Sequence, residues 1–182
     1  MCLSLLSDVR FYDHLLRIDQ ELRDRARREG CPRCGDRLDN APFPRKPRGD
    51  GARLRPEHQQ RLSLCCDACR KRVTPPSVRF YGRRVYWAGA FVLACARKLT
   101  PHWLRRLAEE LGVDRRTVRR WRRWWQETFV HSSWWKLEKG RLCPPPEESE
   151  LPGSLLERFS GDHRRRLDAL LRWLAPSTTA TI

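Results

Sequence analysis

The chain lacks a long hydrophobic run. No stretch of about 18 or more apolar residues occurs in the sequence, so it contains no candidate transmembrane helix. The first eight residues also lack the basic start and the long apolar segment of a secretory signal. We therefore expect the protein to stay in a reducing cytoplasm, where disulfide frameworks are rare.

Acidic residues are outnumbered. The chain carries 22 Asp and Glu against 38 Lys and Arg, which gives a formal net charge of +16 at pH 7. Such a charge attracts polyanions, and counterion release makes that binding steeply dependent on salt. Nucleic acid is the polyanion that we expect. A membrane surface is a distant alternative, because the most basic helix is predicted to pack on a partner helix rather than to carry a lipid-facing stripe.

Signatures of catalysis are also missing. The sequence has no recognisable nucleophilic serine or cysteine motif, no phosphate-binding glycine loop and no histidine-metal nuclease signature. A hydrophobic content of 40% permits a modest core for one domain or two small ones. The sequence thus predicts a folded protein that is not an enzyme.

Cysteine, by contrast, is present in an informative pattern. Four of the eight cysteines form two Cys-x-x-Cys pairs, Cys31 with Cys34 and Cys66 with Cys69. Two such pairs can surround one zinc ion with four sulfurs at about 2.3 Å, which leaves no position open for a substrate. The pattern predicts one structural Zn²⁺ per chain in a small β zinc ribbon. A redox pair with spare thiols is the alternative, and Cys65 is a rival to Cys66 as a ligand.

The segment between the two pairs is long and partly basic. Residues 61–66 alternate as a strand does, whereas residues 36–60 are predicted to be a loop. We expect His58 in this loop to be solvated, and a role as a substitute metal ligand is the alternative. The loop carries three basic residues beside prolines, Arg45, Lys46 and Arg48. These residues either follow a phosphate backbone or form solvated surface. After the second pair we expect some of the further basic residues to contact phosphate: Arg70, Lys71, Arg72, Arg79, Arg83 and Arg84.

Residues 104–125 are the most informative part of the chain. Six of the nine residues from Arg115 to Arg123 are arginine. Ahead of them, Ala108 is small enough to let two helices approach closely, Gly112 can adopt the positive φ of a tight turn, and Asp114 can cap a second helix. This order predicts a helix-turn-helix whose second helix reads DNA.

Two apolar residues, Val118 and Trp121, are predicted to anchor that second helix to the core. The opposite face then carries the candidate DNA contacts Arg115, Arg116, Thr117, Arg119, Arg120 and Arg123. An arginine that makes two hydrogen bonds to guanine contributes about 1–3 kcal/mol of discrimination, whereas an arginine on phosphate adds affinity without sequence information. The alternative is an arginine-rich helix that is merely solvated.

Apolar patterns and helix breakers define the rest of the chain. An apolar stripe over residues 8–28 predicts a helix that packs on the chain's own core or forms a dimerisation arm. Residues 85–98 predict a buried helix, the tryptophan-rich segment 124–135 is expected to form core or an interface, and residues 176–182 are expected to be disordered. We divide the chain into an N-terminal amphipathic helix (1–29), the zinc ribbon (30–80), the helix-turn-helix domain (81–140), and a Pro/acidic linker with short C-terminal helices (141–182).

This order of elements resembles the N-terminal half of bacterial insertion-sequence transposases, which begin with a zinc ribbon followed by a helix-turn-helix. The resemblance covers about residues 30–130 and rests on Cys31-Pro32-x-Cys34, Cys66-x-x-Cys69, Arg72-Val73-Thr74 and the segment from Leu104 to Trp125. It implies recognition of double-stranded DNA at element ends or at a promoter, with the ribbon assisting, in a cytoplasmic, nucleoid-associated protein. The nuclease of that family, with three acidic residues that bind magnesium, is not expected beyond residue 130.

The sequence as a whole predicts a mainly α-helical, non-enzymatic protein with a small β zinc ribbon and a sequence-specific, double-stranded-DNA-binding helix-turn-helix. We expect it to act in transcription regulation as a repressor, or in transposition or recombination as the DNA-targeting partner of a separately encoded recombinase or transposase. A single helix-turn-helix reads a short half-site, so a homodimer or a second contact from the ribbon is expected. The alternative is a scaffold subunit of a larger nucleoprotein complex that binds nucleic acid without reading its sequence.

Overall fold

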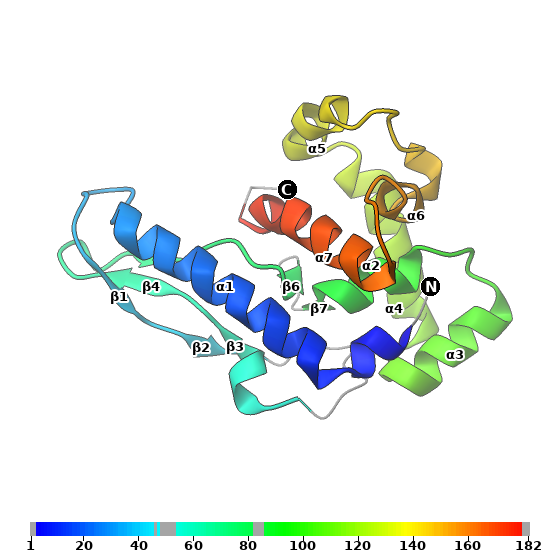
Figure 1. The fold of residues 1–182 in the computed structure, drawn as a ribbon, viewed down its shortest axis with the longest axis horizontal. Helices are drawn as coiled ribbons and strands as arrows, with labels where there is room; N and C mark the ends of the chain where they lie inside the picture. Colours follow the sequence, from blue (N-terminus) through cyan, green and yellow to red (C-terminus); the bar gives the residue numbers. More distant parts are fainter. Residues whose placement is uncertain (1–2, 46, 48–53, 82–85, 180–182) are drawn as a thin grey trace.

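The structure, a computed structural model, describes residues 3–45, 47, 54–81 and 86–179. Over these residues the chain is mainly helical, with small antiparallel sheets, as the sequence predicts. One long helix, α1 (Val9–Glu29), runs along the molecule. The strands of residues 38–66 run alongside it, from its C-terminal end to about its middle, and most of the other helices gather toward its N-terminal end (Figure 1).

Helix α1 forms because its end signals and its apolar stripe agree. The carboxylate of Asp8 accepts a hydrogen bond from the backbone N–H of Arg10, and Gly30 adopts a φ of 79° just beyond the last turn. The apolar stripe is buried in the main hydrophobic core through Phe11, Leu15 and Ile18. The expectation that this helix packs on the chain's own core is therefore confirmed.

The ribbon, residues 30–80, is built around two small antiparallel sheets. One has three strands in the order β1 (Leu38–Asn40), β4 (Leu64–Cys66) and β5 (Arg72–Val73). The other pairs β2 (Phe43–Pro44) with β3 (Gln60–Arg61). The prediction of a loop over residues 36–60 is wrong in part, because β1 and β2 lie within it and gain partners only through long-range pairing.

A hairpin and a buried helix begin the helical body. Strand β6 (Phe80–Tyr81) pairs with β7 (Tyr86–Trp87), which leads directly into α2 (Ala88–Cys95). Every residue of α2 is buried. The helix is shorter than the predicted span 85–98, because residues 86 and 87 are paired in the hairpin and the helix already ends at Cys95.

Helix α3 (Pro101–Leu111) and helix α4 (Arg115–Arg123) are joined by a tight turn. Gly112 in this turn has a left-handed φ of 60°. The carboxylate of Asp114 accepts a hydrogen bond from the backbone N–H of Arg116 and so caps α4. Both predicted end signals are confirmed.

The packing of these two helices agrees with the sequence at α4 but not at α3. Val118 and Trp121, the predicted anchors of α4, are 0% and 1% exposed. Ala108, predicted to lie between the helices, is exposed. The residues that α3 buries are larger: Trp103, Leu104, Leu107 and Leu111. The helices therefore pack through leucine and tryptophan side chains rather than by close approach at a small residue.

The remaining helices enlarge the same core. They are α5 (Ser133–Glu138), α6 (Gly153–Leu156) and α7 (His163–Leu174). Trp125, Phe129 and Trp135, in and after the segment that follows α4, are each 0% exposed and belong to the main cluster. The expected core role of this aromatic segment is confirmed for these rings, since buried rings have no face free to stack on a base.

The C-terminal segment is held by two polar contacts. Residues Ala175–Thr178 form a 3-10 helix, in which the hydroxyl of Ser177 lies 2.7 Å from that of Tyr81. The hydroxyl of Thr178 accepts a hydrogen bond of 3.1 Å from the backbone N–H of Ser77. The expectation of disorder over residues 176–182 is therefore wrong for 176–179, and the last three residues lie outside the described part of the chain.

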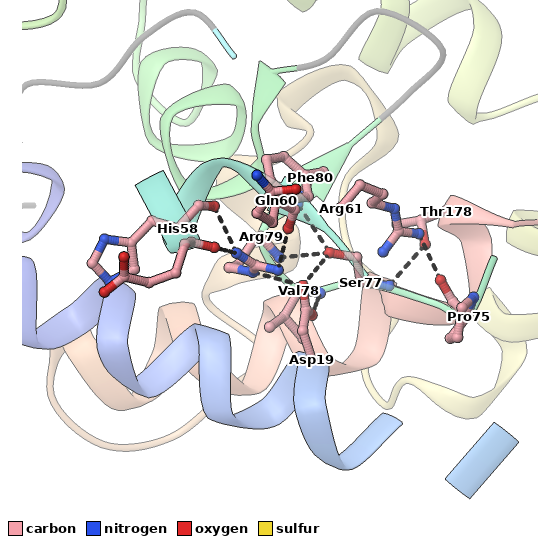
Figure 2. A network of polar contacts seen from close by, with 11 residues as sticks. Asp19, His58, Gln60, Arg61, Pro75, Ser77, Val78, Arg79, Phe80 and Thr178 are labelled. Atoms are coloured by element: carbon pink, nitrogen blue, oxygen red, sulfur yellow. Dashed lines mark hydrogen bonds and ion pairs between the residues drawn. The ribbon is translucent and has the colours of Figure 1, made fainter. Parts of the chain in front are cut away.

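A buried ion pair connects α1, the ribbon and the helical body (Figure 2). The Nε of Arg79 donates to Oδ2 of Asp19 at 2.8 Å, and the two side chains are 0% and 1% exposed. The other guanidinium nitrogens of Arg79 donate to the backbone carbonyls of His58, at 2.6 Å, and Gln60, at 2.8 Å. Asp19 also accepts from the hydroxyl of Ser77 at 2.6 Å. The pair thus fixes the orientation of β3 against α1.

Arg79 was among the basic residues expected to contact phosphate, and for this residue the expectation is wrong. Its side chain is buried and its donors are bound to protein acceptors. Arg61 is similar, since it is 7% exposed and its Nη2 donates to the carbonyl of Pro75 at 2.6 Å. Burial lowers the pKa of Arg61 to about 10, so it stays charged at neutral pH.

Candidate functional site

The four predicted cysteine ligands come together beyond the C-terminal end of α1. The Sγ atoms of Cys31, Cys34, Cys66 and Cys69 all lie within 4.8 Å of one another. The distance is 3.6 Å between Cys31 and Cys69 and 3.4 Å between Cys34 and Cys66. Four sulfurs bonded at about 2.3 Å to one tetrahedral ion lie about 3.8 Å apart, so this donor set fits such an ion closely. The four residues can therefore bind a metal ion.

Both cysteine pairs lie in turns with the same backbone hydrogen bonds. In the first, Gly35 N–H donates to the carbonyl of Cys31 at 2.8 Å, and Cys31 N–H donates to the carbonyl of residue 36 at 2.9 Å. In the second, Arg70 N–H donates to the carbonyl of Cys66 at 3.1 Å, and Cys66 N–H donates to the carbonyl of residue 71 at 2.9 Å. The two turns present their cysteines in the same way, which is why four sulfurs converge.

One position has the same backbone conformation but a different residue type in the two turns. The fourth residue after the first cysteine has a left-handed φ in both, 77° at Gly35 and 56° at Arg70. This conformation costs a residue with a Cβ about 1–2 kcal/mol relative to glycine. We expect Arg70→Gly to raise the free energy of unfolding of the metal-bound protein by about 1 kcal/mol. Gly35→Ala should lower this free energy by a similar amount. Chemical denaturation of the two variants measures both changes, and equal effects of the same sign would contradict this account.

The structure resolves the choice between Cys65 and Cys66. Along β4 the side chains alternate, so Leu64 and Cys66 are buried and Cys65 is only half-buried on the other side. Cys66 joins the sulfur cluster, whereas the thiol of Cys65 lies 3.7 Å from the carbonyl of Cys66. The two-residue spacing to Cys69 therefore identified correctly which of the two cysteines joins the cluster.

The backbone of the first turn favours deprotonation of one cysteine, Cys31. The N–H groups of Arg33 and Cys34 point at the sulfur of Cys31, and these hydrogen bonds lower its pKa to about 6. A cysteine must lose its proton to bind a metal, so the turn favours the ligand form. The amide of Cys69 also donates to the sulfur of Cys66 at 3.4 Å, but the pKa of Cys66 is raised, because burial and the neighbouring thiols of Cys69 and Cys31 outweigh this hydrogen bond.

The second candidate site is the exposed face of α4. Arg115, Arg116, Arg119, Arg120 and Arg123 are exposed there, and Thr117 is half-buried at the edge of that face. Among the described residues, the side chains of Arg115, Arg116 and Arg119 form no ion pair or hydrogen bond, and Arg123 has a long contact of 3.9 Å to Glu127. Val118 and Trp121 hold the opposite side of the helix in the core. The result is a rigid helix with several guanidinium groups free for an external anion.

The remaining arginine of α4 has a structural role. Nη1 of Arg122 donates to the carbonyls of Cys95 and Arg97, at 3.0 and 3.1 Å. These carbonyls belong to the end of α2 and the residues after it, where the helix dipole also favours a cation. Arg122 thus fastens α4 to α2, in agreement with its exclusion from the predicted DNA contacts.

The basic residues predicted in the ribbon loop are only partly described. Lys46 and Arg48 lie outside the described residues, as do Arg83 and Arg84. Arg45 is half-buried, with its guanidinium 4.8 Å from the centre of the Phe43 ring. Of these three predicted residues the structure therefore describes one, Arg45, and its guanidinium packs on an aromatic ring.

His58 is buried rather than solvated, so that prediction is wrong. Its ring is 0% exposed, its Nε2 lies 2.8 Å from Oδ1 of Asp13, and its Nδ1 accepts from the backbone N–H of Arg55 at 3.1 Å. The side-chain hydrogen bond to His58 lowers the pKa of Asp13. Neither Asp13 nor Asp19 was singled out from the sequence, since both lie on α1, far along the chain from their partners.

Comparison with protein-family models, with curated proteins and with solved structures finds no match for this chain. In the described part of the chain, every helix is too short or too polar to cross a bilayer.

Proposed function

We propose that this protein binds double-stranded DNA in a sequence-specific manner through α4, and that α3, the turn at Gly112 and α4 constitute a helix-turn-helix. The observation that carries the proposal is the exposed arginine face of α4, which stands opposite the buried anchors Val118 and Trp121. A helix of this kind fits the major groove, which is about 12 Å wide. Its guanidinium groups match the acceptors of guanine and of phosphate.

The electrostatics of the whole chain support the same partner. A net charge of +16 draws the protein to a polyanion at long range, while the unpaired arginines of α4 supply the local contacts. We propose that it acts as a repressor or as the DNA-targeting subunit of a separately encoded recombinase, and that it binds DNA without reacting with it. The transposase-like order of ribbon and helix-turn-helix in the sequence favours these two roles.

We propose zinc as the metal of the four-cysteine centre. A closed, all-sulfur tetrahedral set is typical of structural zinc, and thiolates select zinc or iron–sulfur chemistry over magnesium or calcium. The ion would hold the two cysteine turns together and has no open position for a substrate. Its contribution is to fold the ribbon, which packs beside α1 and is oriented by Arg79.

Replacement of Arg116 and Arg120 by alanine tests the proposed reading face. We expect the affinity for a preferred duplex to fall by about 100-fold, because each lost bidentate contact costs about 1–3 kcal/mol. Affinity for a scrambled duplex should fall by less than about 10-fold, since only two cations that can contact phosphate are lost. Fluorescence anisotropy at fixed salt measures both affinities.

The matched control removes the same charge elsewhere. Arg10 and Arg17 are exposed on α1, so an Arg10→Ala/Arg17→Ala variant changes net charge equally but leaves α4 intact. This control variant should bind the two duplexes slightly more weakly than the wild type does, and by the same factor for both. Equal losses on both duplexes for the α4 variant would show that its arginines touch phosphate alone. Equal binding of RNA and DNA would favour the scaffold that grips nucleic acid without reading it.

A further inference from the structure

One arginine on the exposed face of α4 differs from its neighbours in having a fixed partner. Nη2 of Arg120 donates a hydrogen bond of 2.8 Å to the hydroxyl of Tyr86. Arg115, Arg116 and Arg119, by contrast, form no side-chain hydrogen bond with any described residue. An arginine that is already oriented loses less rotamer freedom when it binds than a free one does.

Tyr86 is itself held firmly. It lies in β7, where it pairs with Tyr81 across the hairpin. Its ring packs edge-on against Trp121, with centroids 4.7 Å apart, and lies nearly parallel to Phe91, with an interplanar angle of 5°. The hydroxyl therefore reaches the surface of α4 from a ring that is fixed by the core.

The hydrogen bond leaves the guanidinium able to bind a base. Arginine has five N–H donors, and the contact with Tyr86 uses one of them. Two parallel N–H groups suffice for the bidentate contact to O6 and N7 of guanine. A tyrosine hydroxyl also carries no charge, so it orients the cation without neutralising it. A carboxylate in the same place would neutralise the guanidinium.

We propose that Tyr86 is a positioning residue that orients Arg120 for recognition of one guanine in the major groove. This inference rests on the proposed DNA binding by α4 and assigns one sequence-reading contact within it. The hairpin β6–β7 thereby takes part in specificity through a side chain that itself need not touch DNA.

Tyr86→Phe removes the hydroxyl and keeps the ring, so it tests the proposal directly. With the duplex selected by the wild-type protein, and with duplexes in which each guanine in turn is replaced, we expect discrimination at one guanine to fall by about 3- to 10-fold. Binding to scrambled duplex and thermal stability should stay unchanged. In an Arg120→Ala background the same substitution should have no further effect on discrimination, because the group that it positions is absent.

Tyr81→Phe is the matched control from the same hairpin. The hydroxyl of Tyr81 contacts Ser177 rather than α4, so its loss should lower stability without altering guanine discrimination. If Tyr86→Phe weakens binding to all duplexes equally, or changes binding to none of them, the positioning role is overturned. If the Arg116→Ala/Arg120→Ala variant also binds every duplex as the wild type does, the proposed function itself fails, which separates the two results.

Discussion

Replacement of Cys34 by serine, or removal of the metal with a chelator, is expected to unfold the ribbon. Among the described residues, the ribbon's own hydrophobic cluster has four buried members, Cys31, Leu38, Leu64 and Cys66, and two of these are proposed ligands. So small a core cannot offset the conformational entropy of the ribbon, whereas structural zinc contributes about 10–16 kcal/mol of apparent binding free energy in small zinc-finger domains at pH 7. A zinc ion bound by the four cysteines would therefore supply most of the local stability.

Two measurements on the full chain check this expectation. Metal content should fall from one ion per chain to none in Cys34→Ser, and amide hydrogen exchange should become fast across β1, β4 and β5 while α2 stays protected. Cys65→Ser is the matched control, because Cys65 is next to a ligand but its sulfur lies outside the cluster. If Cys34→Ser retains one ion and normal protection, the four-cysteine assignment is wrong.

Arg79→Ala is expected to destabilise the protein by about 3–5 kcal/mol, the range found when one partner of a buried ion pair is removed. The substitution leaves the carboxylate of Asp19, which is 1% exposed, without its cation. It also removes the donors to the carbonyls of His58 and Gln60. Urea denaturation followed by tryptophan fluorescence measures the change.

Two further variants show whether the loss comes from the uncompensated charge. Arg79→Met combined with Asp19→Leu removes both charges and should recover a large part of the stability, because well-packed apolar residues can replace a buried pair. Arg23→Ala breaks a surface pair with Asp24, whose side chain is 46% exposed, and should cost less than about 1 kcal/mol. An Arg79→Ala variant as stable as Arg23→Ala would contradict the structural role of the pair.

Local signals in the sequence predicted the parts of the fold that depend on neighbouring residues. The cap at Asp114 and the glycine at 112 act within a few residues, so both were predictable, as was the burial of Val118 and Trp121. The convergence of the four cysteines was also predictable, because the x-x spacing encodes the turn that aims two sulfurs at one point.

The features that the sequence did not reveal depend on residues far apart in the chain. Arg79 meets Asp19 across 60 positions, and no spacing pattern distinguishes it from the exposed arginines nearby. His58 is buried because α1 brings Asp13 to its ring. The hydrogen bond from Arg120 to Tyr86 likewise requires the hairpin to fold back on α4. Composition predicted a basic surface, but only the fold separates arginines used inside the protein from those left free.

The most direct test of DNA reading by α4 is selection of bound duplexes from a random pool at about 150 mM salt, where non-specific attraction is screened. The wild-type protein is expected to enrich a short motif that contains guanine, and the Arg116→Ala/Arg120→Ala variant is expected to lose it. An inverted repeat in the motif would indicate a symmetric dimer. Binding without enrichment of any motif would contradict sequence-specific recognition and favour a scaffold that holds nucleic acid by charge alone.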